Sequence, residues 1–312
     1  MSPVDLLGVD GGGTSTAAWL ADADGHVLGR GLGGPSNIKA IGAEAARAGL
    51  EGAIRAAFED AGRDPSPIAA ACLGLAGFDR PEDKGWLEQW ASGMPWAGRS
   101  IFVNDGDLVI AAGTPGGWGV GVIAGTGSIA VGRGPDGRSA RSGGWGYLIG
   151  DEGSGYAVAL AGLRRVARLA DGRAPGRSGS DPLTARLCEA LGIDGPSGMV
   201  GAVYREGRDR ARIAALAPAV VAAAGEDPAI VDEILGPAGR ELARMVDAAA
   251  RGIGAGPVPL PLAMAGSFLL NSPVVSAAML RWLAEAGHEV RATPVPDPVR
   301  GALILAREVL QS

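Results

Sequence analysis

The chain has 312 residues, enough for two domains of ordinary size. Its formal net charge of −6 excludes a general attraction to nucleic acid or to an anionic membrane, so any phosphate it binds must be held locally. No apolar run reaches transmembrane length and no signal-peptide pattern opens the chain, so we expect a cytoplasmic protein.

The first part of the chain reads as strands and helices in alternation. Buried strands are predicted at 6–10, 16–22, 27–34, 68–77 and 100–106, and helices at 43–62 and 81–90. The dipeptide Asp24-Gly25 between the second and third strands is a strong hairpin signal. Polar residues end the strand at 100–106, where a carboxylate can face a cleft.

Residues 121–146 repeat the pattern of residues 8–34. Both stretches run strand, glycine turn, strand, Asp-Gly turn, strand, and one gap aligns them. We interpret the match as two domains that share an opening hairpin and arose by duplication, although chance similarity between glycine-rich stretches is the alternative.

The second part of the chain is mostly helical. Helices are predicted at 155–171, 181–192, 210–225, 227–254, 272–287 and 298–310, with strands at 260–268 and 288–294. A surface loop is expected at 172–180.

Three tight glycine turns each follow an apolar strand: Gly11–Thr14, Gly125–Ser128 and Gly266-Ser267. Glycine lets a phosphate approach backbone amides closely, and threonine or serine adds a hydroxyl donor. The chain has no Gly-x-x-x-x-Gly-Lys-Ser/Thr loop and no Gly-x-Gly-x-x-Gly that opens a helix. Each turn alone could be a plain hairpin, but the three together predict a nucleotide held by backbone dipoles.

These residues resemble the superfamily of sugar kinases, actin and heat-shock chaperone ATPases. Within it, the chain resembles the N-acetylglucosamine kinase branch of the BadF/BadG/BcrA/BcrD ATPase family. The stretches "GVDGGGTST" and "VIAGTGS" resemble its phosphate motifs, "GGWGYLIGDEGSGY" is the most specific match, and "GPSN", "VNDG" and "MAGSF" match its remaining loops.

The resemblance implies an α/β, two-domain actin-like ATPase (ribonuclease H-like) fold: duplicated mixed sheets with flanking helices and a central cleft. We expect one domain at 1–112, with the helix at 297–312 packed back on it, and the other at 113–296 with a helical insertion. The insertion, residues 153–256, would supply the adenine pocket. Two lobes of similar design suggest hinge closure that excludes water.

The expected activity is transfer of the γ-phosphoryl group of ATP to an amino-sugar hydroxyl. Asp105 is the candidate general base, a role that the resemblance also assigns. Asp10, beside the first glycine turn, is the candidate for orienting Mg²⁺ through water. The alternatives are a helix N-cap for Asp105 and a hairpin aspartate for Asp10, and Asp107 is the better cap candidate.

The other candidate site residues divide by ligand. Expected to bind the nucleotide are Gly11, Gly12, Gly13, Thr14, Thr126, Gly127, Gly266 and Ser267. Expected to bind the sugar, with Asp105, are Asn37, Thr126, Ser128, Gly143, Gly144 and Asp151. Asn37 could instead be a turn asparagine, Glu152 and Ser154 are expected to cap the next helix, and Trp145 is expected in the core or a wall.

N-acetylglucosamine is the expected acceptor, giving its 6-phosphate, and glucosamine is the alternative. We expect ATP, Mg²⁺ and the sugar as ligands, no nucleic acid or membrane partner, and a homodimer. Two other readings remain. An activator ATPase would need cysteines for an iron–sulfur cluster, whereas this chain has only Cys72 and Cys188, both expected to be buried. A nucleotide-dependent regulatory protein of the same fold is the other.

Overall fold

The computed structural model describes residues 5–78, 81–94, 96, 99–174, 180–204, 210–256 and 259–311. The chain divides into two compact units, Met1–Gly121 with Asp297–Ser312 and Val122–Pro296. The domain boundaries expected from the sequence stay a prediction. Most of the surface loop expected at 172–180 lies outside the described residues.

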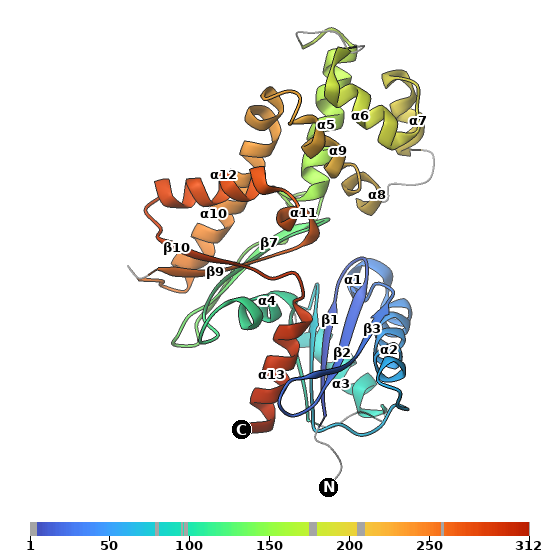
Figure 1. Ribbon diagram of the computed structural model, residues 1–312, viewed down its shortest axis with the longest axis vertical. Coiled ribbons are helices and arrows are strands. Elements are labelled where there is room, and N and C mark those ends of the chain that lie inside the picture. Colours follow the sequence, from blue (N-terminus) through green and yellow to red (C-terminus); the bar gives the residue numbers. More distant parts are fainter. Residues whose placement is uncertain are drawn as a thin grey trace. The chain divides into compact units, whose positions relative to one another are not determined.

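The first unit is built on a five-stranded mixed sheet (Figure 1). Its strands lie in the order β3-β2-β1-β4-β5. The strands are β1 (Leu6–Gly11), β2 (Thr16–Ala21), β3 (Val27–Gly33), β4 (Ala70–Leu75) and β5 (Arg99–Asn104). β1, β4 and β5 are parallel, so their carboxyl ends meet at one edge. β2 is antiparallel to both of its neighbours, as the two predicted hairpin turns require.

Helices cover both faces of this sheet, as Figure 1 shows. The helices are α1 (Ile38–Ile41), α2 (Ala43–Asp60), α3 (Pro81–Ser92), α4 (Asp105–Gly113) and α13 (Val299–Gln311). Leu7 and Val9 of β1 pack in a core with Leu50 and Phe58 of α2. The other face packs against α4 and α13. The strand is therefore apolar on both sides, which is typical of a central parallel strand.

The second unit repeats the sheet topology of the first. Its strands are β6 (Gly119–Ala124), β7 (Ser128–Arg133), β8 (Ser139–Gly143), β9 (Leu260–Ala265) and β10 (Val290–Pro294). They lie in the order β8-β7-β6-β9-β10, which is the order of the first sheet with each strand replaced by its counterpart. The duplicated mixed sheets predicted from the glycine-rich repeat are therefore confirmed.

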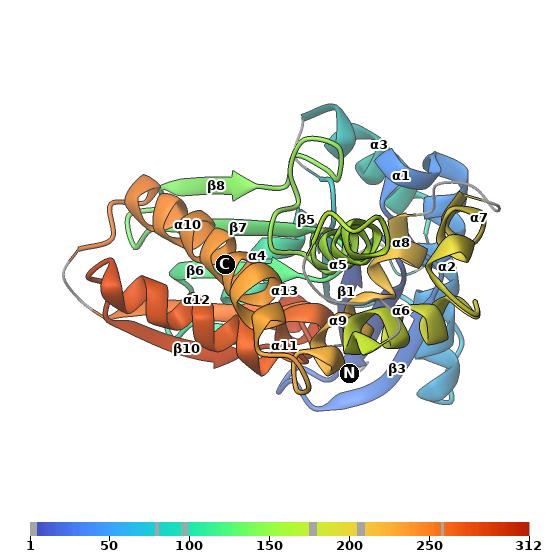
Figure 2. The same ribbon diagram turned by 90° about the horizontal axis from the view of Figure 1, so that it is seen from above.

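Helices of the second unit fall into two groups. α10 (Gly236–Gly252) packs on β7 and β8 and beside α12 (Pro273–Glu285), as Figure 2 shows from above. The short α11 (Ser267–Leu270) follows β9. Besides α10, the stretch 153–256 expected as an insertion contains α5 (Gly155–Ala170), α6 (Pro182–Leu191), α7 (Met199–Tyr204), α8 (Arg210–Ala214) and α9 (Ala217–Ala223).

Two predicted helices are interrupted. The helix expected at 210–225 divides into α8 and α9, and Pro218 lies in the first turn of α9, where its missing amide costs nothing. The helix expected at 227–254 begins as a π-turn, Val231–Leu235, before α10. Glu233 in that turn pairs with Arg165 of α5 at 3.1 Å. The spacing of apolar residues predicted the buried face of each helix, but it did not predict these interruptions.

Within the described residues, no helix combines the length and the apolar character needed to cross a bilayer. Both cysteines are buried as expected, Cys72 in β4 and Cys188 in α6.

Candidate active site

The first glycine loop joins β1 to β2 and is fixed from its base. The Gly12 amide donates to Ser15 O at 2.9 Å, and the Ser36 amide donates to Gly12 O at 3.0 Å. A Cβ at Gly11 would lie 2.3 Å from Leu75 Cδ2, so a side chain there would force Leu75 to move. Gly13 and Thr14, by contrast, are exposed, and their amides donate to no acceptor among the described residues. The loop therefore presents donors on a rigid base.

Asp10 and Asp105 lie at the same edge of the first sheet. Asp10 is near the end of β1, and Asp105 follows the end of β5, with β4 between the two strands. Burial, with the nearby negative charge of Asp105, raises the pKa of Asp10 to about 7. The two carboxylates at this edge supply hard oxygen atoms, the kind of ligand that Mg²⁺ prefers.

Asp105 is the first residue of α4, and Asn104 is its N-cap. The Gly106 amide donates to Asn104 Oδ1 and to Asp105 Oδ1, both at 3.0 Å. The expectation that Asp107 caps this helix is wrong, because the helix begins two residues earlier and the asparagine amide oxygen already accepts the bond. The capping alternative for Asp105 is likewise wrong, since the cap is its neighbour.

Asn37 lies on the loop after β3, close to Gly77. It caps α1, and its Oδ1 accepts from the Lys39 amide at 3.1 Å. A Cβ at Gly77, where φ is +80°, would come within 2.9 Å of Asn37 Oδ1. The turn alternative is therefore correct in part, and the sugar-binding role of Asn37 stays a prediction.

The second glycine loop joins β6 to β7. The Gly125 amide donates to Gly127 O at 3.0 Å, and Gly155 at the start of α5 donates to Gly125 O at 2.8 Å. Gly266 approaches from the end of β9, where φ is +93° and a Cβ would lie 2.4 Å from Ala124 O. Only glycine allows this approach. Thr126, Gly127, Gly266 and Ser267 therefore lie in one region of the second unit.

Asp151 joins that region from the loop after β8. It is buried, and its φ of 60° is the one positive value among described residues other than glycine. Its Oδ1 accepts from the Ser128 amide at 3.2 Å, and burial raises its pKa. A Cβ at Gly127 would lie 2.9 Å from both carboxylate oxygens, so this glycine makes room for Asp151.

Of the residues near Asp151 in the sequence and the fold, Ser128 and Ser154 stabilise the loops, whereas Trp145 is exposed. The buried Ser128 hydroxyl donates to Glu152 O at 2.6 Å, so it ties the two loops together. Ser154 caps α5, as expected, with the Ala157 amide at 3.2 Å from its Oγ. Trp145 is 72% exposed, so its expected place in the core is wrong. It lies on a loop beyond β8, outside the apolar layers of the sheet.

The glycine pair Gly143 and Gly144 ends β8 with positive φ at both residues. The Arg141 guanidinium donates to Gly144 O at 2.7 Å, and the Gly144 amide donates to Ser128 O at 3.0 Å. Arg141 was not among the site residues predicted from the sequence. Neither was Arg210 of α8, whose Nη1 lies 3.4 Å from Asp151 Oδ2. No sequence signal pairs residues so far apart along the chain.

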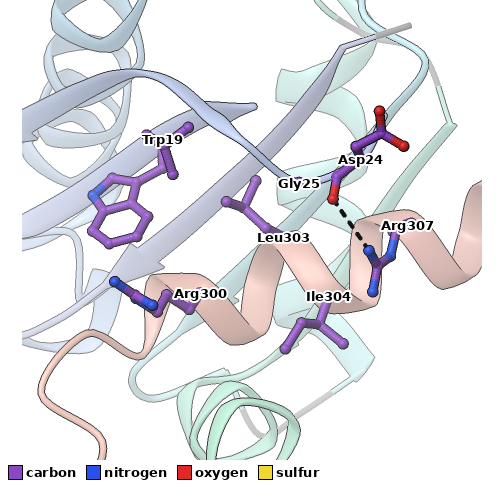
Figure 3. Close-up of a pocket in the computed structure, with 8 residues that line it drawn as sticks. Trp19, Asp24, Gly25, Arg300, Leu303, Ile304 and Arg307 are labelled. Carbon is purple, nitrogen blue, oxygen red and sulfur yellow. Dashed lines mark hydrogen bonds between the residues drawn. The ribbon is translucent and has the colours of Figure 1, made fainter. Parts of the chain in front are cut away.

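A separate hollow of about 270 Å³ lies in the first unit, away from these strand ends (Figure 3). Trp19 of β2 and the Asp24-Gly25 turn face Arg300, Leu303 and Arg307 of α13 across it. None of the predicted site residues lines it.

Two sheets of one topology, each with a glycine loop after its first strand, define the class of actin-like ATPases and sugar kinases. A solved glucokinase of the ROK family from Streptomyces griseus, in complex with glucose and AMPPNP, has this fold. It is 18% identical, with a TM-score of 0.57 over 97% of this chain and 99% of that one.

The chain belongs to the BadF/BadG/BcrA/BcrD ATPase family, whose model matches residues 7–306. It is 32% identical to the N-acetylmuramic acid/N-acetylglucosamine kinase of Clostridium acetobutylicum, over 97% of this chain and 98% of the relative. It is 35% identical to the N-acetyl-D-glucosamine kinase of Dictyostelium discoideum, over 65% of this chain and 66% of that one. A structure from Chromobacterium violaceum, provisionally assigned as an N-acetylglucosamine kinase, is 31% identical with a TM-score of 0.75, over 98% and 100% of the two chains.

Proposed function

We propose that this chain is an ATP-dependent amino-sugar kinase, with N-acetylglucosamine as the acceptor and its 6-phosphate as the product. One observation carries the proposal: Asp105 starts a helix at the same sheet edge as the first glycine loop, in a chain of this family. That edge offers both groups that phosphoryl transfer needs, donors for phosphate and a carboxylate for a proton.

Asp105 is the general base in this proposal. Its place in the first turn of α4 fixes its backbone, and the capping bond of Asn104 fixes the helix start. A carboxylate held there accepts the proton of the acceptor hydroxyl as its oxygen attacks the γ-phosphorus. Asn37 and Asp151, with Thr126, Gly143 and Gly144, bind the other groups of the sugar.

Backbone amides replace lysine as the phosphate ligands. Gly13 and Thr14 in the first loop, and Thr126 and Gly127 in the second, donate to the phosphate oxygens. Gly266 and Ser267 hold the α-phosphate or ribose, and residues of the 153–256 insertion hold the adenine. Asp10 suits Mg²⁺, because its carboxylate is a hard oxygen ligand and lies near the negative charge of Asp105. When bound, Mg²⁺ neutralises charge that develops on the phosphates.

The acceptor class rests on the relatives. Those that match are named as kinases of N-acetylglucosamine, of N-acetylmuramic acid and, in Vibrio cholerae, of glucosamine. All three sugars are hexosamines, so glucosamine remains the alternative acceptor. An activator ATPase finds less support, because Cys72 and Cys188 are each buried, one in a strand and one in a helix. The homodimer and the cytoplasmic location also stay proposals.

The test replaces Asp105 by asparagine and follows ADP release with Mg²⁺-ATP over a panel of hexoses and hexosamines. We expect kcat with N-acetylglucosamine to fall about 100- to 10,000-fold, the usual contribution of a general base. Sugar binding, measured by calorimetry, should persist, because the amide keeps the shape of the carboxylate.

Asp107→Asn is the matched control, since it changes the same helix two residues further on and should keep turnover. Retained turnover in Asp105→Asn would remove Asp105 as the base. ATP binding without sugar-dependent ADP release for any hexosamine would remove the kinase proposal itself.

A further inference from the structure

Arg210 is a half-buried arginine that the proposed mechanism does not use. It starts α8 in the helical insertion, and its Nη1 reaches Asp151 Oδ2 across 59 residues of sequence at 3.4 Å. It therefore lies beside a carboxylate that the proposed function assigns to the sugar.

The Asp151 carboxylate is held in place without Arg210. The Ser128 amide binds its Oδ1, the Ser154 amide donates to its backbone oxygen at 3.2 Å, and Gly127 leaves room for both oxygens. A salt bridge of 3.4 Å adds little to this anchoring, because strong guanidinium–carboxylate bonds measure about 2.7–2.9 Å. Orienting Asp151 is thus a weak explanation for Arg210.

The guanidinium of Arg210 also keeps donors to spare. Its side chain is 33% exposed, and Asp151 is its one ion-pair partner among the described residues. Arg165 in the same insertion shows the contrast, because its guanidinium binds Asp181, Asp227 and Glu233 at 3.0, 2.7 and 3.1 Å. Arg165 is a structural cation, whereas Arg210 has a face open to a further anion.

We propose that Arg210 is a specificity residue, which binds a carboxylate carried by the amino-sugar substrate next to the hydroxyl group that Asp151 holds. The proposal rests on the proposed function, because it places the sugar at Asp151. A planar guanidinium fits a carboxylate through two parallel hydrogen bonds, and a neutral hexosamine offers no such partner. The substrate class is therefore an amino sugar with an acidic substituent on one of its hydroxyl oxygens.

The experiment compares kcat/KM for three acceptors in the intact protein: N-acetylglucosamine, N-acetylmuramic acid, whose lactyl ether at O3 carries a carboxylate, and the methyl ester of that acid. The wild-type protein should prefer the acid over its ester by about 10- to 100-fold, the effect of charge-assisted hydrogen bonds. Arg210→Gln should reduce this preference to nearly one while changing kcat/KM for N-acetylglucosamine little.

Arg212→Gln is the matched control, because it removes a charge from the same short helix and should keep the preference for the acid. Turnover of N-acetylglucosamine by Arg210→Gln serves as its folding control, and the acid–ester comparison in the wild type needs no variant.

Equal losses on all three acceptors in Arg210→Gln would overturn the proposal and make Arg210 a positioning residue for Asp151. Wild-type turnover of N-acetylglucosamine without preference for the acid would overturn it too, and leave the kinase function standing. Turnover of none of the acceptors would contradict both this proposal and the proposed kinase function.

Discussion

At the scale of single residues, the candidate site contains two carboxyl groups whose ionisation costs free energy. Burial raises the pKa of Asp10 and of Asp151, and Asp151 also adopts a backbone conformation unusual for a residue with a side chain. Neither carboxylate is explained by packing, because a neutral side chain would be cheaper to bury. Perturbed acids of this kind are concentrated at functional sites, which is why they support the proposed function.

Asp151→Asn should make the protein more stable at neutral pH. The folded-state pKa of Asp151 is raised, so the folded protein binds its proton more tightly than the unfolded chain, and ionisation costs stability as pH rises through that range. The gain in Tm over wild type should be largest at neutral pH and shrink below about pH 4, where the carboxyl is protonated in both states. Thermal melts from pH 3.5 to 8 check this.

Kinase activity should fall in the same variant, because Asn accepts hydrogen bonds from sugar hydroxyls less strongly than a carboxylate. A Tm difference that stays constant with pH would show that the Asp151 pKa is not raised by folding.

At the scale of elements, glycines decide how closely helix and sheet approach. Gly29, Gly31 and Gly33 alternate along β3 and face α2, and a Cβ at any of them would lie within 2.2 Å of a helix carbonyl oxygen. The composition therefore serves two purposes, with some glycines in loops that face phosphate and others in strands under helices. The sequence predicted a role only for the glycines of the tight turns, and the packing role of the glycines in β3 was not predicted.

Gly31→Ala should destabilise the protein by about 1–3 kcal/mol, because the added methyl would lie 2.0 Å from Ala53 O and force α2 away. The matched variant is Gly52→Ala on α2 itself. Its methyl meets nothing within 4 Å, and alanine favours a helix by up to about 1 kcal/mol over glycine, so stability should rise. Urea unfolding measures both, and equal effects would contradict this packing.

At the scale of the whole molecule, the sequence predicted the elements and their duplication well. Alternating apolar strands and the two Asp-Gly turns carried that information locally. Contacts between distant segments carried no such signal: the pairing of Arg210 with Asp151 and of Arg165 with the π-turn follow from how the helices of the insertion pack. The spacing of apolar residues shows which face of a helix is buried, but it does not show which segment packs against that face.

The C-terminal helix is the clearest long-range feature that the sequence did suggest. α13 packs against β1 and β4, so that Val299 O and Leu303 lie 3.0 Å from a Cβ placed at Gly8. Gly301 sits still closer, against the backbone of Leu108 in α4. The last helix of the chain thus completes the core of the first unit, whose strands all come from the first third of the chain.

Leu303→Ala and Leu283→Ala should destabilise different units. Both side chains are buried, 7% and 0% exposed, one in α13 of the first unit and the other in α12 of the second. Each change leaves a cavity that costs about 2–5 kcal/mol. Hydrogen exchange followed by mass spectrometry should show lost protection in β1 and β4 for Leu303→Ala, and in α10 and β10 for Leu283→Ala. Because local opening follows the cooperative unit in which a cavity lies, the two patterns should not overlap.

Loss of protection throughout the chain in either variant would mean that the two units unfold as one, and that α13 stabilises the whole molecule and not the first sheet alone.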